Sequence, residues 1–171
     1  MTEKQPHGSN SAEQSKFESG IITKLKEKFE GIEFPTDFYE PIEKSGIKFQ
    51  VDFYNIEKKI FGEIYVCKFP LKSGHLRKIK GDILKLLTIE KILGDPIQKY
   101  MVLTIESENN KNKILESKEL EKNLFGDKSW FSETIALFKI KMLYYTLSKE
   151  EAENLNEVRK RQKEGMKLSK N

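Results

Sequence analysis

Two carboxylates, Asp52 and Glu63, are the residues of this chain best placed to do chemistry. Asp52 belongs to the alternating segment 47–54, and Glu63 belongs to the apolar segment 60–69. Alternation with period two predicts strands, and the short polar turn 57–59 between the segments predicts a β-hairpin. Two carboxylates that converge can hold Mg²⁺, which favours one or two carboxylates with waters and substrate phosphate. Such an ion would activate water and neutralise charge on a scissile phosphate.

The register of this hairpin decides whether the two carboxylates meet. With the turn at 57–59, Asp52 is expected near Ile64, one residue away from Glu63. Neighbours along a strand point to opposite faces, so Asp52 and Glu63 share a face only if a bulge or a register offset intervenes. The structural alternative is that Asp52 faces solvent and Glu63 pairs with a lysine.

A helix with one charged face is expected after the hairpin. Apolar residues at three-to-four-residue spacing predict it over 74–93, and Gly94 ends it. Its polar residues at i, i+3, i+7 and i+10 line one face: His75, Lys78, Asp82 and Lys85. A lysine on this face can stabilise a phosphorane-like charge. Alternatively, Lys78 and Asp82 form an ordinary i, i+4 ion pair of about 0.3–0.5 kcal/mol.

Structural roles are expected for three other residues that could do chemistry: His75, Cys67 and Trp130. His75, near a helix start, is more often a surface residue than a catalytic base. Cys67, in an apolar strand, is more often a small buried hydrophobe than a nucleophile. Trp130, which follows a helix N-cap at Ser129, is expected to anchor its helix in the core. The alternative for Trp130 is a platform on which nucleic-acid bases stack.

Charge and composition narrow the class of protein. The chain has 171 residues, which suits one domain, and a net charge of +4. Basic residues concentrate in 72–91 and 159–171, which favours a polyanion partner, although solvated faces would give the same pattern. One cysteine excludes an intramolecular disulfide and a multi-cysteine zinc site, and two distant histidines argue against a histidine-built one. With no long apolar run and no signal core, we expect a cytoplasmic chain without a membrane partner.

The order of the remaining elements predicts an α/β fold. Residues 1–12 are expected to be a disordered tail, 13–158 a single domain and 159–171 a basic tail. Within the domain, the further predicted elements are a helix over 13–30, strands over 99–106 and 140–147, helices over 116–124 and from Ser129, and a polar helix after the capping box 148–151. Strands separated by helices favour a partly parallel sheet. We therefore expect a mixed central sheet with a front hairpin and flanking helices.

The residues of the hairpin and the helix resemble the core of the PD-(D/E)XK nuclease-like superfamily. The similar segments are Asp52, then Gly62-Glu63-Ile64-Tyr65, then Lys78-Ile79 and Asp82-Ile83-Leu84-Lys85-Leu86. The region also resembles small uncharacterised bacterial proteins with a Gly-Glu-Ile-Tyr strand, a lysine-aspartate helix and a later Ser-Trp helix followed by a strand, here Lys128-Ser129-Trp130 and 140–146. The GxxxxGK[ST], GxGxxG, GxSxG and HExxH motifs are absent.

The resemblance implies a restriction-endonuclease-like fold and a Mg²⁺-dependent nuclease acting on DNA or RNA. In that superfamily an Asp on one strand and a Glu-x-Lys on the next form the metal site, which here implies Asp52 and Glu63. The lysine position holds Tyr65, so a lysine of the neighbouring helix is nominated, Lys78 or Lys85, with Lys68 as another candidate.

Lys78, Lys85 and Arg77 would then contact the nucleic acid. The alternatives are a catalytically inactive binding module of the same fold and an accessory protein whose charges only solubilise it. Whether the chain forms a homodimer is left open.

Overall fold

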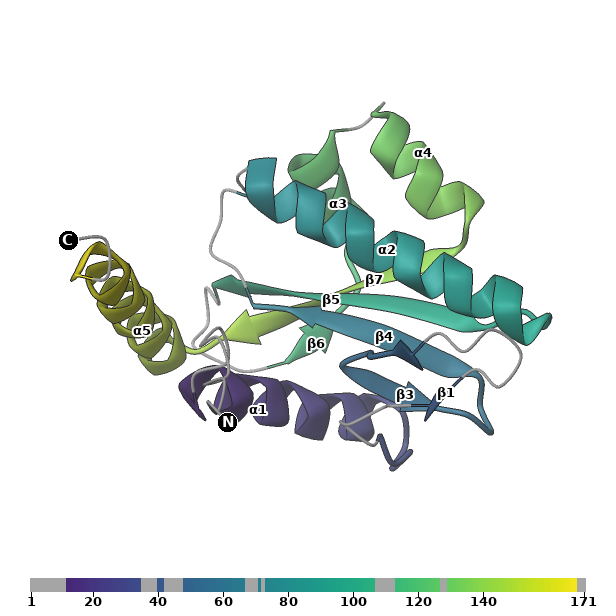
Figure 1. Cartoon of the computed structure of the whole chain (residues 1–171), viewed down its shortest axis with the longest axis horizontal. Helices are drawn as coiled ribbons and strands as arrows, with labels where there is room; N and C mark the ends of the chain where they lie inside the picture. The colour runs from purple at the N-terminus through teal and green to yellow at the C-terminus, as the bar shows by residue number, and fades with distance from the viewer. Residues whose placement is uncertain are drawn as a thin grey trace, which may run out of the picture.

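A computed structural model describes residues 12–34, 40–41, 48–66, 71, 73–106, 113–126 and 129–168 (Figure 1). Residues 1–11 of the predicted N-terminal tail lie outside the described residues, and Ala12 is the first residue of the first helix. Cys67 and Lys68 lie outside the described residues as well. Across the described residues, the chain forms an α/β fold with five helices and a five-stranded mixed sheet. No helix in these segments is both long and apolar enough to cross a membrane.

The five-stranded sheet has the order β3-β4-β5-β7-β6. Its strands are β3 (Phe53–Asn55), β4 (Ile60–Tyr65), β5 (Gln98–Glu106), β6 (Ile114–Leu115) and β7 (Ile140–Leu147). The three central strands β4, β5 and β7 run parallel, and each edge strand pairs antiparallel with its neighbour. The predicted mixed sheet with a front hairpin is confirmed.

Helices cover both faces of this sheet. Helix α1 (Ala12–Lys28) lies on one face, and α2 (Ser73–Leu93), α3 (Lys118–Phe125) and α4 (Trp130–Leu137) lie on the other (Figure 1). Even-numbered residues of β4, such as Ile64, pack in the α1 core, whereas odd-numbered residues, such as Phe61, pack against α2. Ion pairing between Glu90 of α2 and the buried Lys99 of β5 fixes the far end of α2 over the sheet.

Capping side chains set where the helices begin. Ser129 Oγ accepts a hydrogen bond from Ser132 N at 3.1 Å and starts α4. The predicted capping box starts α5 (Lys149–Leu168), because Ser148 N donates to Glu151 Oε2 while Glu151 N donates to Ser148 Oγ. Helix α5 therefore continues into the predicted basic tail.

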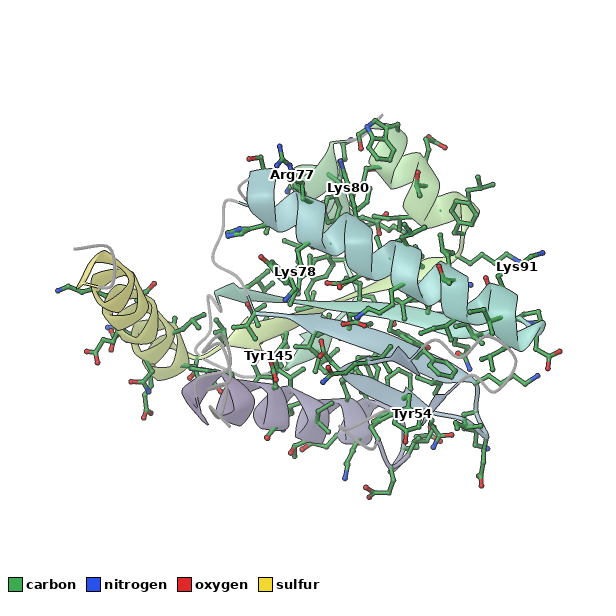
Figure 2. The ribbon with its side chains drawn as sticks, in the orientation of Figure 1. Tyr54, Arg77, Lys78, Lys80, Lys91 and Tyr145 are labelled. Carbon is green, nitrogen blue, oxygen red and sulfur yellow. The ribbon has the colours of Figure 1, made fainter. Side chains whose placement is uncertain are left out.

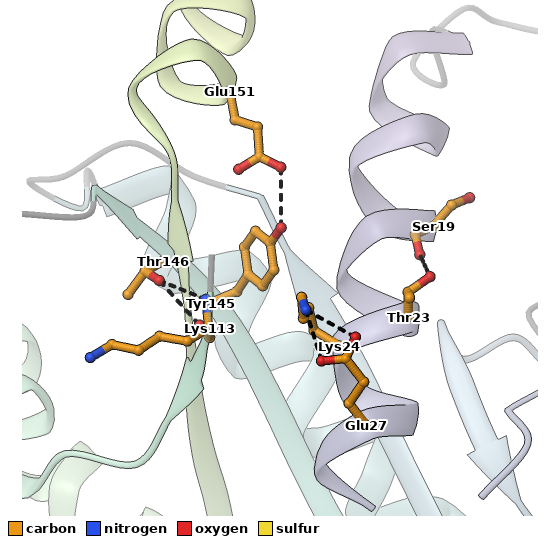
Figure 3. A network of polar contacts seen from close by, with 8 residues as sticks. All are labelled: Ser19, Thr23, Lys24, Glu27, Lys113, Tyr145, Thr146 and Glu151. Carbon is orange, nitrogen blue, oxygen red and sulfur yellow. Dashed lines mark hydrogen bonds and ion pairs between the residues drawn. The ribbon is translucent and has the colours of Figure 1, made fainter. Parts of the chain in front are cut away.

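Polar contacts tie the end of β7 to its surroundings (Figure 3). Tyr145 Oη donates to Glu151 Oε1 at 3.1 Å and so joins β7 to α5. Lys113 N donates to Thr146 Oγ1 at 2.9 Å beside the edge strand β6. These contacts hold the last strand between α5 and β6, away from the hairpin end of the sheet.

Two strand predictions are wrong. The segment 47–54 is not one strand, because β2 (Lys48–Phe49) pairs with β1 (Glu40–Pro41) in a separate two-stranded sheet, and only β3 joins the hairpin. Strand β4 ends at Tyr65, before the predicted end at Phe69. Strand β6, which lies just before the predicted helix 116–124, was not predicted. Its two residues are too few to give a periodic signal.

Candidate functional site

The site begins with a glycine that lets two strands approach. Phe53 pairs with Gly62, and a Cβ on Gly62 would lie 2.1 Å from Cζ of the Phe53 ring. The ring therefore lies over the glycine, and only glycine leaves it room. The same pairing offsets the hairpin by one residue from the predicted register. The predicted register is therefore wrong by one residue, and the offset that Asp52 and Glu63 need in order to share a face is present; the charge of Asp52 acts on the Glu63 carboxyl.

Asp52 anchors the end of the hairpin through its side chain. The chain bends at Asp52, immediately before β3, and leaves the regular ladder. Its Oδ2 accepts a hydrogen bond from Ile64 N at 2.7 Å. The half-buried carboxylate thus substitutes for a main-chain partner of β4, and the alternative of a purely solvent-facing residue is wrong.

Glu63 is buried beneath α2, with only 4% of its surface exposed. Its Oε1 lies 2.5 Å from Lys85 Nζ, which also lies 3.6 Å from Asp82 Oδ1 and donates to Gln50 O at 2.9 Å. The lysine thus joins the strand carboxylate, the helix carboxylate and the main chain before β3. The alternative in which Glu63 pairs with a lysine is confirmed, and it coexists with the approach of Asp52.

The electrostatics of this cluster favour protonated Glu63. Burial and the neighbouring charge of Asp52 raise the pKa of Glu63 from 4.5 to about 8, against the lowering effect of Lys85. Burial also raises the pKa of Asp82, and Lys85 and Lys78 oppose that rise. Perturbed carboxyl pKa values of this origin gather at functional sites, although structural ion-pair networks produce them as well.

Lys78 and Lys85 have different surroundings although the sequence nominates both. Lys78 Nζ lies 5.0 Å from the centre of the Tyr65 ring, and the His75 ring meets the same tyrosine edge to face at 5.8 Å. Tyr65 follows Glu63 by two residues on the same face of β4, so Lys78 places its charge above the residue that neighbours Glu63 on this face. Among the described residues, Asp82 pairs with Lys85, so the expected Lys78–Asp82 ion pair is wrong.

Trp130 does not anchor α4 in the core. Its side chain is 66% exposed, whereas the next residue, Phe131, is buried and packs with Ile135 of the same helix. The core-anchor prediction is therefore wrong for Trp130 and describes Phe131. Helical spacing does separate the two adjacent aromatic residues, because Phe131 precedes Ile135 by four residues and shares its face, whereas Trp130 precedes it by five and does not.

The residues that could hold a metal ion are Asp52 and Glu63. No cluster of three or more histidine, cysteine, aspartate or glutamate side chains is arranged to hold one within the described segments. Two carboxylates suffice for Mg²⁺ when waters and phosphate complete its shell. A cation at Glu63 would have to replace the ammonium of Lys85, whose long side chain reaches this carboxylate from α2.

Comparison of the chain with protein-family models, with curated proteins and with solved structures finds no significant match. The candidate site is therefore defined by its own residues. The structure brings together Asp52, Glu63, Asp82 and Lys85, places Lys78 beside them over Tyr65, and leaves Arg77 exposed on the outer side of α2.

Proposed function

We propose that this chain is a Mg²⁺-dependent nuclease that acts on DNA or RNA phosphodiesters. The observation that carries the proposal is the buried Glu63 carboxyl, which the charge of Asp52 influences and which Lys85 of the helix above contacts. In the superfamily that the sequence resembles, two carboxylates hold the metal ion beside a lysine, and the ion assists phosphodiester hydrolysis. The restriction-endonuclease-like fold is part of the proposal, supported by the hairpin, the crossover helix and the parallel strand β5.

Each residue has a role that follows from its position. Asp52 and Glu63 would hold Mg²⁺, which when bound neutralises charge on the scissile phosphate and makes water a better nucleophile. Glu63 must be ionised for this role. Its pKa of about 8 already includes the lowering effect of Lys85, so binding of Mg²⁺ would release a proton from Glu63. Lys78, exposed above Tyr65, presents its ammonium to the phosphate. Arg77 and Lys85 contribute further positive charge along α2.

A second candidate is a nucleic-acid-binding module of the same fold without catalysis. The observation that favours it is the contact between Glu63 and Lys85, because it occupies a buried carboxylate with a cation of the protein itself. In that case the positive residues of α2 would bind phosphates, while the carboxylates would only orient the helix over the hairpin.

The test compares cleavage by the wild-type chain and by variants of the hairpin. Labelled single-stranded and duplex DNA and RNA are incubated with each protein and Mg²⁺ or Mn²⁺. We expect Glu63→Gln and Asp52→Asn to abolish cleavage, while Glu57→Gln retains it. Glu57 is a matched control because it is an exposed carboxylate in the turn of the same hairpin. Melting curves establish that all four proteins are folded.

Equal cleavage by wild type and Glu63→Gln would discard this site. Absence of cleavage by the folded wild-type chain, together with binding that weakens steeply with salt, would select the binding module instead. Phosphate contacts release counterions, so affinity falls with ionic strength. Binding that ignores salt would refute the phosphate-contact model for both candidates.

A further inference from the structure

Trp130 is an exposed aromatic side chain with a lysine beside it. Its side chain is 66% exposed at the first residue of α4, and Lys80 Nζ of α2 lies 4.3 Å from the centre of its ring. This contact is a cation–π interaction, and it holds the indole at the boundary between α2 and α4. Lys80 and the edge contact with Phe131 at 5.9 Å use part of the indole, and the remainder of its flat apolar surface is open to solvent.

The first half of α2 places positive charges around its solvent side. With about 100° between successive residues of a helix, Lys80 and Arg77 lie about 60° apart, and Lys78 follows about 100° further on. Figure 2 shows Lys78 on the sheet side of α2, with Arg77 and Lys80 on the side of α4. Residues 73–81 contain no acidic residue. The nearest acidic residue of α2 is Asp82, whose pKa burial raises and the charge of Lys78 lowers, and whose ion pair is with Lys85.

These basic residues connect the carboxylate site to Trp130. Lys78 lies over Tyr65, next to Glu63 on the same strand face, and Lys80 lies over Trp130. Arg77 is exposed between them on the outer side of the helix. A ligand that reaches from the carboxylate site to Trp130 must cross the width of helix α2 with its side chains, about 10–12 Å. A strand of a few nucleotides spans such a width.

We propose that Lys78, Arg77, Lys80 and Trp130 form a binding track for single-stranded nucleic acid. The backbone phosphates lie on the three basic side chains and one unpaired base stacks on the indole. This deepens the proposed function and rests on it for the nature of the substrate. Positive charge matches the phosphates, and the exposed indole selects an unpaired base because bases within a duplex have both faces covered. DNA and RNA share this chemistry.

The single tryptophan of the chain makes the track measurable. Because Trp130 is the only tryptophan, the intrinsic indole fluorescence reports on this position alone. The protein is titrated, with a chelator present to prevent cleavage, with an oligothymidylate, an oligouridylate, an abasic strand of equal length and a duplex. We expect quenching by the two single strands, and little or none by the abasic strand or the duplex.

Variants test the same contact through the anisotropy of a labelled strand. We expect Trp130→Ala to weaken binding roughly 5- to 150-fold, the range of one base–aromatic stack. Lys80→Gln should weaken binding and reduce its dependence on salt by about one phosphate contact. Leu137→Ala is the matched control, because the Leu137 side chain is 75% exposed on the same helix. The affinity of this variant for the labelled strand should equal that of wild type.

Several results would overturn the track. Anisotropy that shows binding while Trp130 emission is unchanged would refute stacking and leave the carboxylate site standing. Indole emission that shifts on concentrating the protein alone would assign this surface to contact between copies of the chain. Conversely, quenching by single strands with equal cleavage by wild type and Glu63→Gln would uphold the track and discard the catalytic site.

Discussion

Glu63→Gln separates the electrostatics of the buried carboxyl from its packing. Burial and Asp52 raise the pKa of Glu63 from 4.5 in a solvated chain to about 8 in the folded one. Below pH 4.5 the group is protonated in both states and has no effect on the free energy of unfolding. Between pH 4.5 and 8 the unfolded chain releases a proton that the folded chain retains, so stability falls as the pH rises.

The size of this effect follows from the displacement of the pKa. Each pKa unit corresponds to about 1.36 kcal/mol, so the full window amounts to about 5 kcal/mol of stability lost by pH 8. The free energy of unfolding is measured by chemical denaturation from pH 4 to pH 9 for wild type and Glu63→Gln. The difference, wild type minus variant, should fall by several kcal/mol across this range.

Taking the difference removes the contribution of all other titrating groups. Glu57→Gln, in the exposed turn of the same hairpin, is the matched control for removal of a carboxylate that is not buried. A difference that is flat for Glu63→Gln would refute the raised pKa. A difference that grows with pH would mean that Glu63 is ionised in the folded chain and that its pairing with Lys85 outweighs burial.

Two further predictions use matched pairs of substitutions whose free energies of unfolding are measured by chemical denaturation. Gly62→Ala should destabilise the fold by about 1–3 kcal/mol or more, because the new methyl group meets the buried Phe53 ring. Gly81→Ala, in open space within α2, should stabilise the fold by up to about 1 kcal/mol. Equal effects of the two substitutions would contradict the close approach in the hairpin. Tyr144→Phe should raise stability by roughly 1 kcal/mol, because it removes a buried hydroxyl that has no hydrogen-bond partner among the described residues. Tyr145→Phe should lower stability by about 1 kcal/mol, because the Tyr145 hydroxyl donates a hydrogen bond to Glu151 of α5. A loss of stability for Tyr144→Phe would reveal an unrecognised partner of the Tyr144 hydroxyl.

The helices and the central strands were predictable because their signals are local. The apolar period of α2 and the continuous apolar run of β7 place both elements within a residue or two of their observed bounds. Capping residues such as Ser129 mark helix starts directly. Strands β1, β2 and β6 span two residues each, and a pairing of that length depends on partners that are distant in the sequence.

The candidate site was predictable in its members but not in its geometry. Asp52 and Glu63 were recognised by type and position, yet their approach depends on a register shift of one residue. That shift is set by the fit of the Phe53 ring over Gly62, which no periodic pattern encodes. Lys78 lies over Tyr65 whereas Lys85 contacts Glu63, and this difference likewise depends on which residue of β4 lies under each turn of α2.

The hydrogen bond from Ile64 N to Asp52 also bears on how the molecule avoids aggregation. Strand β4 has six residues but β3 pairs with only three of them, so part of its outer edge has no strand partner among the residues that the structure describes. An open edge is a template on which another chain can add a strand. Asp52 fills this position with a charged side chain, which satisfies the amide and repels an incoming backbone. At the opposite edge of the sheet, β6 has only two residues, too few to serve as the template for an added strand.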